Sequence, residues 1–386
     1  MRPSSFLVRF IAMGIALHVY VGARLIPPLG LSGAGVAGAI LALVVLVCIA
    51  PAGMLSRRIS RQPLSDRVAW VGFLAMGFFS SLFVLTLLRD VGLILYRLAR
   101  WAGDWAEPAQ LMRDTAMLVP IAAVLVTLIG LYNARRRAPL RHVTVPQAGM
   151  PPALASLRIV QLSDIHVGPT IKRGYVQAIV EAVNAQQPDL VVITGDLVDG
   201  SVAALAPHIA PLGALRARHG VFVVTGNHEY YAGAPAWVAH FQVLGMRPLM
   251  NEHVVIDHDG ATFVLAGITD YNAGGFVAGH RSDPVKAMAG APTDVAVRIV
   301  LAHQPRSAPA AAHAGFTLQL SGHTHGGQFL PWPAFVRFQQ PFVFGLRQLN
   351  GMWIYISRGT GYWGPPKRFF APSEITCLRL RDVSPQ

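Results

Sequence analysis

The chain has 386 residues, of which 53% are hydrophobic and only 13% are charged. Soluble domains carry roughly 25% charged residues, so this composition excludes a fully solvated protein. It also excludes a disordered chain, because disordered segments are polar and rich in charge. Two cysteines, Cys48 and Cys377, are too few for a disulfide framework or a cysteine-rich zinc site. These figures indicate a membrane protein with a further domain attached.

The net charge of +13 is concentrated in the apolar part of the chain. Residues 1–142 hold 15 arginines and five acidic residues, an excess of ten positive charges, whereas the remainder has an excess of only three. Arginines commonly flank membrane spans. The charge therefore does not indicate a polynucleotide-binding surface, and we expect no nucleic-acid partner.

Four apolar stretches approach or exceed the ~20 residues that a membrane-spanning helix needs. They are Phe10–Leu29, Ser32–Leu55, Val68–Leu88 and Ala116–Tyr132. The first contains Arg24 and resembles a signal peptide in position, but a second long span follows at once and no small-residue cleavage site ends it. We therefore predict a transmembrane region of about four helices over residues 1–140.

The distribution of arginines predicts the orientation of these spans, because cytoplasmic loops are enriched in basic residues. Ten arginines fall on one side: Arg2, Arg9, Arg57, Arg58, Arg61, Arg67, Arg135, Arg136, Arg137 and Arg141. Four fall on the other: Arg24, Arg97, Arg100 and Arg113. Both termini and the C-terminal half are expected to be cytoplasmic. The pair Arg89 and Asp90 is interpreted as snorkelling to the membrane interface, with a functional intramembrane pair as the alternative.

After a Pro-containing linker, Pro139 to Pro152, the pattern changes to short β-branched runs that end in polar clusters. The runs cover residues 157–160, 189–193, 221–224, 298–301 and 318–320. Val176, Ile179, Val180 and Val183 recur at helical spacing between the first two runs, which predicts a helix connecting two strands. In such sheets ligands bind at the carboxyl ends of the strands, so the polar clusters are expected to converge on one site.

The polar residues at these strand ends supply oxygen and nitrogen ligands without thiolate. They are Asp164, His166, Asp196, Asp199, Asn227, His228, His303, His323 and His325. Such a donor set suits Mn, Fe or Zn. There are enough ligands for two metal ions that share a bridging carboxylate.

The order of the motifs resembles that of the calcineurin-like metallophosphoesterases over roughly residues 155–380. The motifs are Asp164-x-His166, Gly195-Asp196-x-x-Asp199, Gly226-Asn227-His228-Glu229, a lone His303 and Gly322-His323-x-His325. Gly326-Gly327-Gln328 and Arg358-Gly359 are similar to a bacterial membrane-associated branch, some members of which hydrolyse UDP-2,3-diacylglucosamine. The resemblance implies an α/β/β/α sandwich over residues 141–386 and a location in the bacterial inner membrane.

The same resemblance implies a role for each strand-end residue. One metal ion would be held by Asp164, His166 and His325, and a second by Asn227, His303 and His323. Asp196 would bridge the two ions. His228, oriented by Asp199, would be the general acid or the electrostatic stabiliser at the leaving oxygen. The implied reaction is phosphoester hydrolysis by attack of a metal-bridging hydroxide, which requires no serine or cysteine nucleophile.

Two features of the sequence bear on the substrate. Gly200 follows Asp199, where the phosphoprotein phosphatases carry a phosphate-binding arginine, so a phosphodiester or pyrophosphate is favoured over a phosphoprotein. The segments 329–346 and 362–370 mix aromatic and basic residues. We expect them to form an apolar, basic-rimmed lip that takes a lipid phosphate from the bilayer. The alternative is that they are ordinary strands and loops of the domain.

The leading prediction is a membrane-anchored phosphoesterase that acts on a lipid or nucleotide-lipid diester or pyrophosphate. A second prediction keeps the chemistry but makes the substrate a soluble nucleotide, with the spans only an anchor. A third is a transporter or sensor whose C-terminal domain binds metal without turnover. The complete ligand set argues against this last alternative. The sequence indicates no particular oligomeric state.

Overall fold

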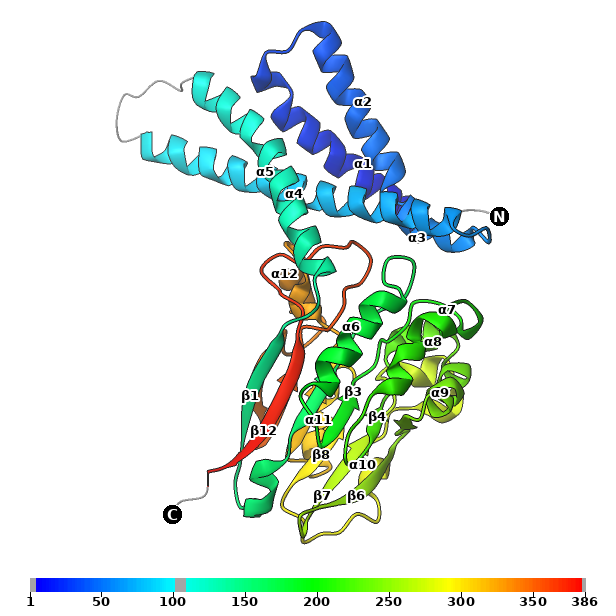
Figure 1. Cartoon of the computed structure of the whole chain (residues 1–386). Helices are drawn as coiled ribbons and strands as arrows, with labels where there is room; N and C mark the ends of the chain where they lie inside the picture. Colours follow the sequence, from blue (N-terminus) through cyan, green and yellow to red (C-terminus); the bar gives the residue numbers. More distant parts are fainter. Residues whose placement is uncertain (1–4, 101–108, 384–386) are drawn as a thin grey trace. The chain divides into compact units, whose positions relative to one another are not determined.

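The computed structural model describes residues 5–100 and 109–383 (Figure 1). Contacts divide the chain into two units. The helical unit comprises the chain up to Tyr132 together with the segment Gly364–Phe369. The sandwich unit comprises Asn133–Trp363 and the chain from Phe370 onward. Arg2, which entered the orientation argument, lies outside the described residues.

The helical unit contains the predicted apolar helices. Its α-helices are α1 (Ser5–Leu25), α2 (Gly33–Ile49), α3 (Ala52–Leu55), α4 (Leu64–Arg100) and α5 (Ala109–Arg135). Four helical stretches in the described chain are long and apolar enough to cross a membrane, namely Ile11–Leu29, Gly33–Arg58, Leu64–Arg100 and Ala109–Arg135. The prediction of four apolar helices is therefore confirmed.

A polar network connects three of these helices. The carboxylate of Asp90 in α4 accepts hydrogen bonds from Tyr20 Oη and Arg24 Nε of α1, each at 2.7 Å. Arg89 donates to Thr115 Oγ1 of α5 at 3.0 Å and to the carbonyl of Met112 at 3.1 Å. Both Arg89 and Asp90 are buried between the helices. The structure therefore does not support the snorkelling interpretation, because short-range partners on neighbouring helices satisfy both groups.

The sandwich unit contains two six-stranded sheets. The first has the order β1 (Leu140–Gln147), β12 (Ile375–Asp382), β2 (Ile159–Leu162), β3 (Leu190–Ile193), β4 (Val221–Val223) and β5 (Arg247–Pro248). The second has the order β10 (Gly345–Leu349), β11 (Met352–Ile356), β9 (Leu318–Ser321), β8 (Arg298–Leu301), β7 (Ala261–Gly267) and β6 (Glu252–His258). Strands β2 to β5 run parallel, as do β7, β8, β9 and β11.

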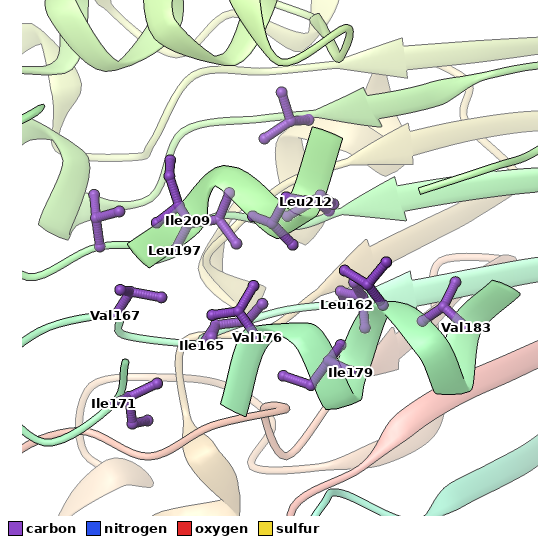
Figure 2. Packing of buried hydrophobic residues seen from close by; sticks show 14 of the residues in the cluster. Leu162, Ile165, Val167, Ile171, Val176, Ile179, Val183, Leu197, Ile209 and Leu212 are labelled. Carbon is purple, nitrogen blue, oxygen red and sulfur yellow. The ribbon is translucent and has the colours of Figure 1, made fainter. Parts of the chain in front are cut away.

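Three layers of apolar packing produce the predicted α/β/β/α sandwich. Residues of both sheets, including Ile159, Phe263 and Leu320, form the core between the sheets. The outer face of the first sheet is covered by α6 (Arg173–Asn184), α7 (Val202–Ile209) and α9 (Ala234–Val243), as Figure 2 shows for α6 and α7. The outer face of the second sheet packs against α10 (Pro284–Met288) and α11 (Ala308–His313). Burial on both faces explains why strands such as β3 and β4 are continuously apolar.

The segment 139–152, predicted as a linker, contains strand β1. This strand pairs in parallel with β12, with Leu140 opposite Ile375 (Figure 1). The linker interpretation is therefore wrong for residues 140–147. The partner strand lies more than 200 residues later in the chain, so no local pattern reveals the pairing. Pro146 is tolerated because β1 is at the edge of its sheet.

Candidate active site

The parallel strands bring the polar clusters together at their carboxyl ends. Asp164 and His166 follow β2, and Asp196 and Asp199 follow β3. Asn227 and His228 open the short helix α8 (Asn227–Ala232) after β4. His303 follows β8, and His323 and His325 follow β9. Hydrogen bonds and short contacts connect all nine predicted residues into one network, so the convergence predicted from the strand ends is observed.

The first candidate metal-binding group consists of Asp164, His166 and His325, whose ligand atoms all lie within 4.8 Å of one another. The Nε2 atoms of the two histidines are 3.0 Å apart, and His325 Nε2 is 3.6 Å from Asp164 Oδ1. The Asp164 carboxylate also accepts hydrogen bonds from Ser163 Oγ at 2.5 Å and from the backbone N–H of His323 at 3.0 Å. It thereby fixes the loop of the second sheet against the first.

The second group consists of Asp196, His303 and His323. His303 Nε2 lies 3.2 Å from both Asp196 Oδ2 and His323 Nδ1, and 3.1 Å from Asn227 Oδ1. The other ring nitrogen of His303 donates to the carbonyl of Thr194 at 2.7 Å. Because a carbonyl can only accept a hydrogen bond, the neutral ring carries its proton on Nδ1. The lone pair of Nε2 is then directed at the other ligand atoms of the second group.

Asp196 lies between the two groups. Its Oδ2 atom is 3.2 Å from His303 Nε2 of the second group and 3.7 Å from His166 Nε2 of the first. Its Oδ1 atom accepts the backbone N–H of His228 at 2.9 Å. One carboxylate therefore faces both sets of ligand atoms, which is the position that a bridging ligand requires.

Asp199 binds two histidines through one oxygen. Asp199 Oδ1 lies 2.6 Å from His228 Nδ1 and 3.1 Å from His166 Nδ1. Burial opposes the charged imidazolium, but the charge of Asp196 and the hydrogen bond to Asp199 outweigh burial and raise the pKa of His228 to about 9. Burial likewise favours the neutral Asp199 carboxyl, but the two histidines hold its pKa well below the usual range. The neighbouring carboxylates therefore favour the protonated form of the His228 ring.

The backbone at the candidate ligands is strained. Five non-glycine residues of the site have left-handed φ values, namely Asp164 (54°), His166 (54°), Asp196 (54°), His323 (69°) and His325 (52°). Each such residue costs on the order of 1–3 kcal/mol and persists only where its surroundings enforce it. Two glycines leave room for the carboxylates: a Cβ atom on Gly226 would lie 2.2 Å from Asp196 Oδ1, and one on Gly322 would lie 2.2 Å from Asp164 Oδ2.

Glu229 is a site residue to which the sequence analysis assigned no role. Its fully buried carboxylate accepts backbone N–H groups from Asp196 at 2.9 Å, Leu197 at 2.7 Å and Gly226 at 2.7 Å. Burial and the charge of Asp196 raise the pKa of Glu229 to about 7. The signal for this role was the spacing Gly226-x-x-Glu229, the second half of a helix capping box.

The donor set fits divalent cations. Asp164, Asp196 and Glu229 are buried, and the charge of Asp196 raises the pKa of the other two carboxyl groups. A buried cluster of carboxylates is costly without compensating positive charge. In the described part of the chain, the carboxylates of Asp164 and Asp196 contact histidines, a serine hydroxyl and backbone amides. Two pairs of ring nitrogens, one in each candidate group, lie only 3.0–3.2 Å apart. Oxygen and imidazole donors suit Mn, Fe or Zn.

Exposed aromatic rings surround His228, a feature that strand-end reasoning did not identify. The ring centroid of Tyr231 lies 5.2 Å from that of His228, and the ring of Trp363 lies 5.7 Å away. Phe276 contacts Tyr231 at 5.5 Å. Tyr231 follows His228 by one helical turn on α8, so the spacing of the two residues could have indicated this contact.

Comparison with known proteins agrees with this geometry. A family model described as calcineurin-like phosphoesterase matches residues 157–327. A bovine (Bos taurus) protein named "Transmembrane protein with metallophosphoesterase domain" is 40% identical over 300 residues, covering 75% of this chain and 67% of that protein. The protein of the same name from Danio rerio is 38% identical over 310 residues, covering 78% and 70% respectively.

A bacterial relative extends the similarity over more of the chain. An uncharacterized metallophosphoesterase of Campylobacter jejuni is 34% identical over 323 residues, which cover 82% of this chain and 83% of that protein. The matched family model, these relatives and the convergent ligand set agree on the chemistry. The chain therefore belongs to the calcineurin-like metallophosphoesterases and is a metal-dependent phosphoesterase that also carries four helices apolar enough to span a membrane.

Proposed function

We propose that the protein uses two divalent cations to hydrolyse a phosphodiester or pyrophosphate in a lipid or nucleotide-lipid substrate at the membrane. The observation that carries the two-metal part is the position of Asp196 Oδ2 between His166 Nε2 and His303 Nε2. Asp164, His166 and His325 would hold one cation, and Asn227, His303 and His323 would hold the other. The cations are Mn, Fe or Zn.

Cations bound by these residues would supply Lewis acidity for activating a water and for neutralising charge on the phosphate. His228 holds a proton on its ring, and its Nε2 atom lies 3.9 Å from Asp196 Oδ2, on the side of the ligand groups. In this position it donates the proton to the leaving oxygen. Asp199 orients the ring through Nδ1 and stabilises its positive charge. Phosphoryl transfer needs little beyond such positioning and electrostatic stabilisation.

The residue after Asp199 supports a diester or pyrophosphate substrate. Gly200 has no side chain with which to bind a further phosphate oxygen. A phosphomonoester carries one more negative charge than a diester and gains most from an additional cation at that position. Without it, we expect the site to prefer the less charged ester.

Exposed aromatic side chains near the ligands support a lipid substrate. Trp332 and Phe335 on α12 (Trp332–Val336) are about half exposed, and Phe338 is 86% exposed. The start of α12 packs on the loop of His325, since a Cβ atom on Gly327 would lie 2.4 Å from Pro333. The lip was expected over 329–346 and 362–370, but Lys367 and Arg368 of the second segment are buried and form no basic rim. We therefore call Trp332, Phe335, Arg337 and Phe338 of the first segment the aromatic lip. Aromatic residues beside an exposed arginine favour contact with an anionic membrane surface.

The arginine-rich loops support a cytoplasmic location for the sandwich unit at a bacterial inner membrane. Arg57, Arg58 and Arg61 lie between α2 and α4, and Arg135 ends α5. Such basic clusters are retained on the cytoplasmic side. The phosphoester would then be drawn from the inner leaflet.

Hydrolysis by the full-length protein with added Mn tests this proposal. Bis(p-nitrophenyl) phosphate and UDP-2,3-diacylglucosamine serve as the soluble and the lipid substrate. Asp196→Asn is expected to abolish turnover of both, and the exposed Asp257→Asn is the matched control. A strong preference for the lipid ester supports the membrane substrate. Turnover of the soluble diester alone would contradict a lipid substrate and would favour a soluble nucleotide as the substrate. Absence of metal-dependent turnover with either ester would contradict the whole proposal.

A further inference from the structure

Three partly exposed aromatic side chains lie around the proposed proton donor. Tyr231, Phe276 and Trp363 are 58%, 51% and 44% exposed. The rings of Tyr231 and Trp363 each meet the ring of His228 edge to face, at interplanar angles of 62° and 72°. Large aromatic side chains gathered at a reactive group and left open to solvent commonly mark a binding surface.

The surrounding structure holds these rings in place. Tyr230, next to Tyr231 on α8, is buried, and its hydroxyl lies 2.9 Å from His280 Nδ1 at the far end of the loop that carries Phe276. The ring of Tyr230 also contacts that of Phe276. Tyr230 therefore fastens the Phe276 loop to the helix that begins with the metal-site residues.

Trp363 is fixed through its backbone. Its N–H donates to Gln328 Oε1 at 2.9 Å, and its carbonyl accepts from Gln328 Nε2 at 3.0 Å. Gln328 follows His325 by three residues in the loop after β9. The indole is thus tied to the same loop as a candidate metal ligand, and no rearrangement is needed to present it.

The orientation of the rings favours a flat partner. Tyr231 and Phe276 meet at 61°, which makes a corner between two ring surfaces. A planar ring can stack on one of these surfaces while its edge meets the other, and both contacts suit the charge distribution of aromatic systems. An alkyl chain bound at the same position would gain binding free energy only from the burial of its apolar surface.

We infer that Tyr231, Phe276 and Trp363 form a subsite for a planar aromatic ring, of the nucleobase type, carried by the leaving group of the substrate. The inference rests on the proposed function, because His228 places the leaving oxygen beside these rings. It assigns the subsite to the leaving side of the ester, separate from the aromatic lip on α12. The substrate class is then a nucleotide-containing diester or pyrophosphate.

Two methyl phosphodiesters with leaving groups of matched acidity, one aryl and one fluorinated alkyl, test the subsite in the full-length protein. Stacking on aromatic side chains predicts that the wild type has a KM about tenfold lower for the aryl ester. Tyr231→Ala and Trp363→Ala should remove this preference by raising KM for the aryl ester. Tyr231→Phe should retain it, and Val243→Ala, which alters an exposed apolar residue of α9, should match the wild type.

The outcomes separate the inference from the proposed function. Equal KM values in the wild type, or an equal loss with both esters in Tyr231→Ala, would overturn the subsite. Absence of all turnover would contradict the proposed function, and binding of a nucleoside monophosphate measured by calorimetry would then decide the subsite. Binding about tenfold weaker in Tyr231→Ala than in Tyr231→Phe supports it, and equal binding by the two variants overturns it.

Discussion

Asp199 Oδ1 lies 2.6 Å from His228 Nδ1, and the same oxygen lies 3.1 Å from Nδ1 of the candidate metal ligand His166. One carboxylate thus orients both the proposed proton donor and a metal ligand. Second partners of this kind fix the tautomer of a ligating histidine and raise its basicity. The proton donor and the metal site are therefore coupled through a single side chain.

This coupling predicts different consequences for two substitutions. His228→Ala removes the proton donor but no ligand, so kcat should fall by about 10²- to 10⁴-fold while the metal content stays that of the wild type. Asp199→Asn should lower kcat and also weaken metal affinity by about 10- to 100-fold, because His166 loses its partner. Steady-state kinetics and elemental analysis of both variants check this. Loss of metal from His228→Ala would instead make His228 a ligand.

Glu229 is predicted to stabilise the site through the backbone. In Glu229→Gln an amide NH₂ replaces one of the oxygens that accept N–H groups from Asp196, Leu197 and Gly226. A buried donor left facing another donor costs about 1–3 kcal/mol. Denaturant unfolding should show this loss relative to Glu252→Gln, a change of an exposed glutamate. An unchanged free energy of unfolding would contradict this role of Glu229.

Acid sensitivity is predicted for the ion pair of Asp189 and Arg158. Burial favours the neutral Asp189 carboxyl, but hydrogen bonds from the Arg158 side chain and backbone hold its pKa below the usual value of 3.8. A lowered folded-state pKa stabilises the protein above the unfolded pKa, and this contribution disappears as the pH falls through the folded pKa. Because the Arg158 side chain is 40% exposed, water screens the pair and its contribution is about 1 kcal/mol.

Asp189→Asn should therefore be less stable than the wild type at pH 7, and the difference should vanish once the pH is well below 3.8. Thermal unfolding across this range measures it. If the difference in stability between the wild type and Asp189→Asn persists unchanged in acid, the charge of the ion pair does not cause it.

The proposed role of the aromatic lip predicts that its substitution lowers hydrolysis of lipid substrates only. Replacing Trp332 and Phe335 by aspartate adds negative charge at exposed positions that we assign to the membrane surface. Hydrolysis of a lipid substrate in vesicles should fall by at least about tenfold, whereas hydrolysis of bis(p-nitrophenyl) phosphate should be unchanged. Equal losses of activity with the two substrates would show that the aromatic lip does not bind the lipid substrate.

Much of the site could be predicted from the sequence because its residues follow buried strands. Strands such as β3 (Leu190–Ile193) are apolar throughout, and the polar residues after them fall at one edge once the strands are parallel. The nine candidate residues follow directly from that rule and the family resemblance. The four apolar helices follow from length and hydropathy alone.

The features that were missed depend on contacts between distant parts of the chain. Strand β1 is defined by pairing with β12, which lies more than 200 residues later. Phe276 reaches Tyr231 from a separate loop. Arg89 and Asp90 find their partners on other helices. Periodicity describes one element at a time and contains no information on such pairings.

The metal content of the purified full-length protein tests the central claim most directly. After removal of metal with a chelator and titration with Mn, the wild type should bind two ions per chain and regain hydrolysis of bis(p-nitrophenyl) phosphate as they bind. Asp196→Asn should lose both the second ion and the activity, because its carboxylate faces both ligand groups. Full activity with one ion or none, or an Asp196→Asn variant that binds two ions and turns over normally, would contradict the two-metal account.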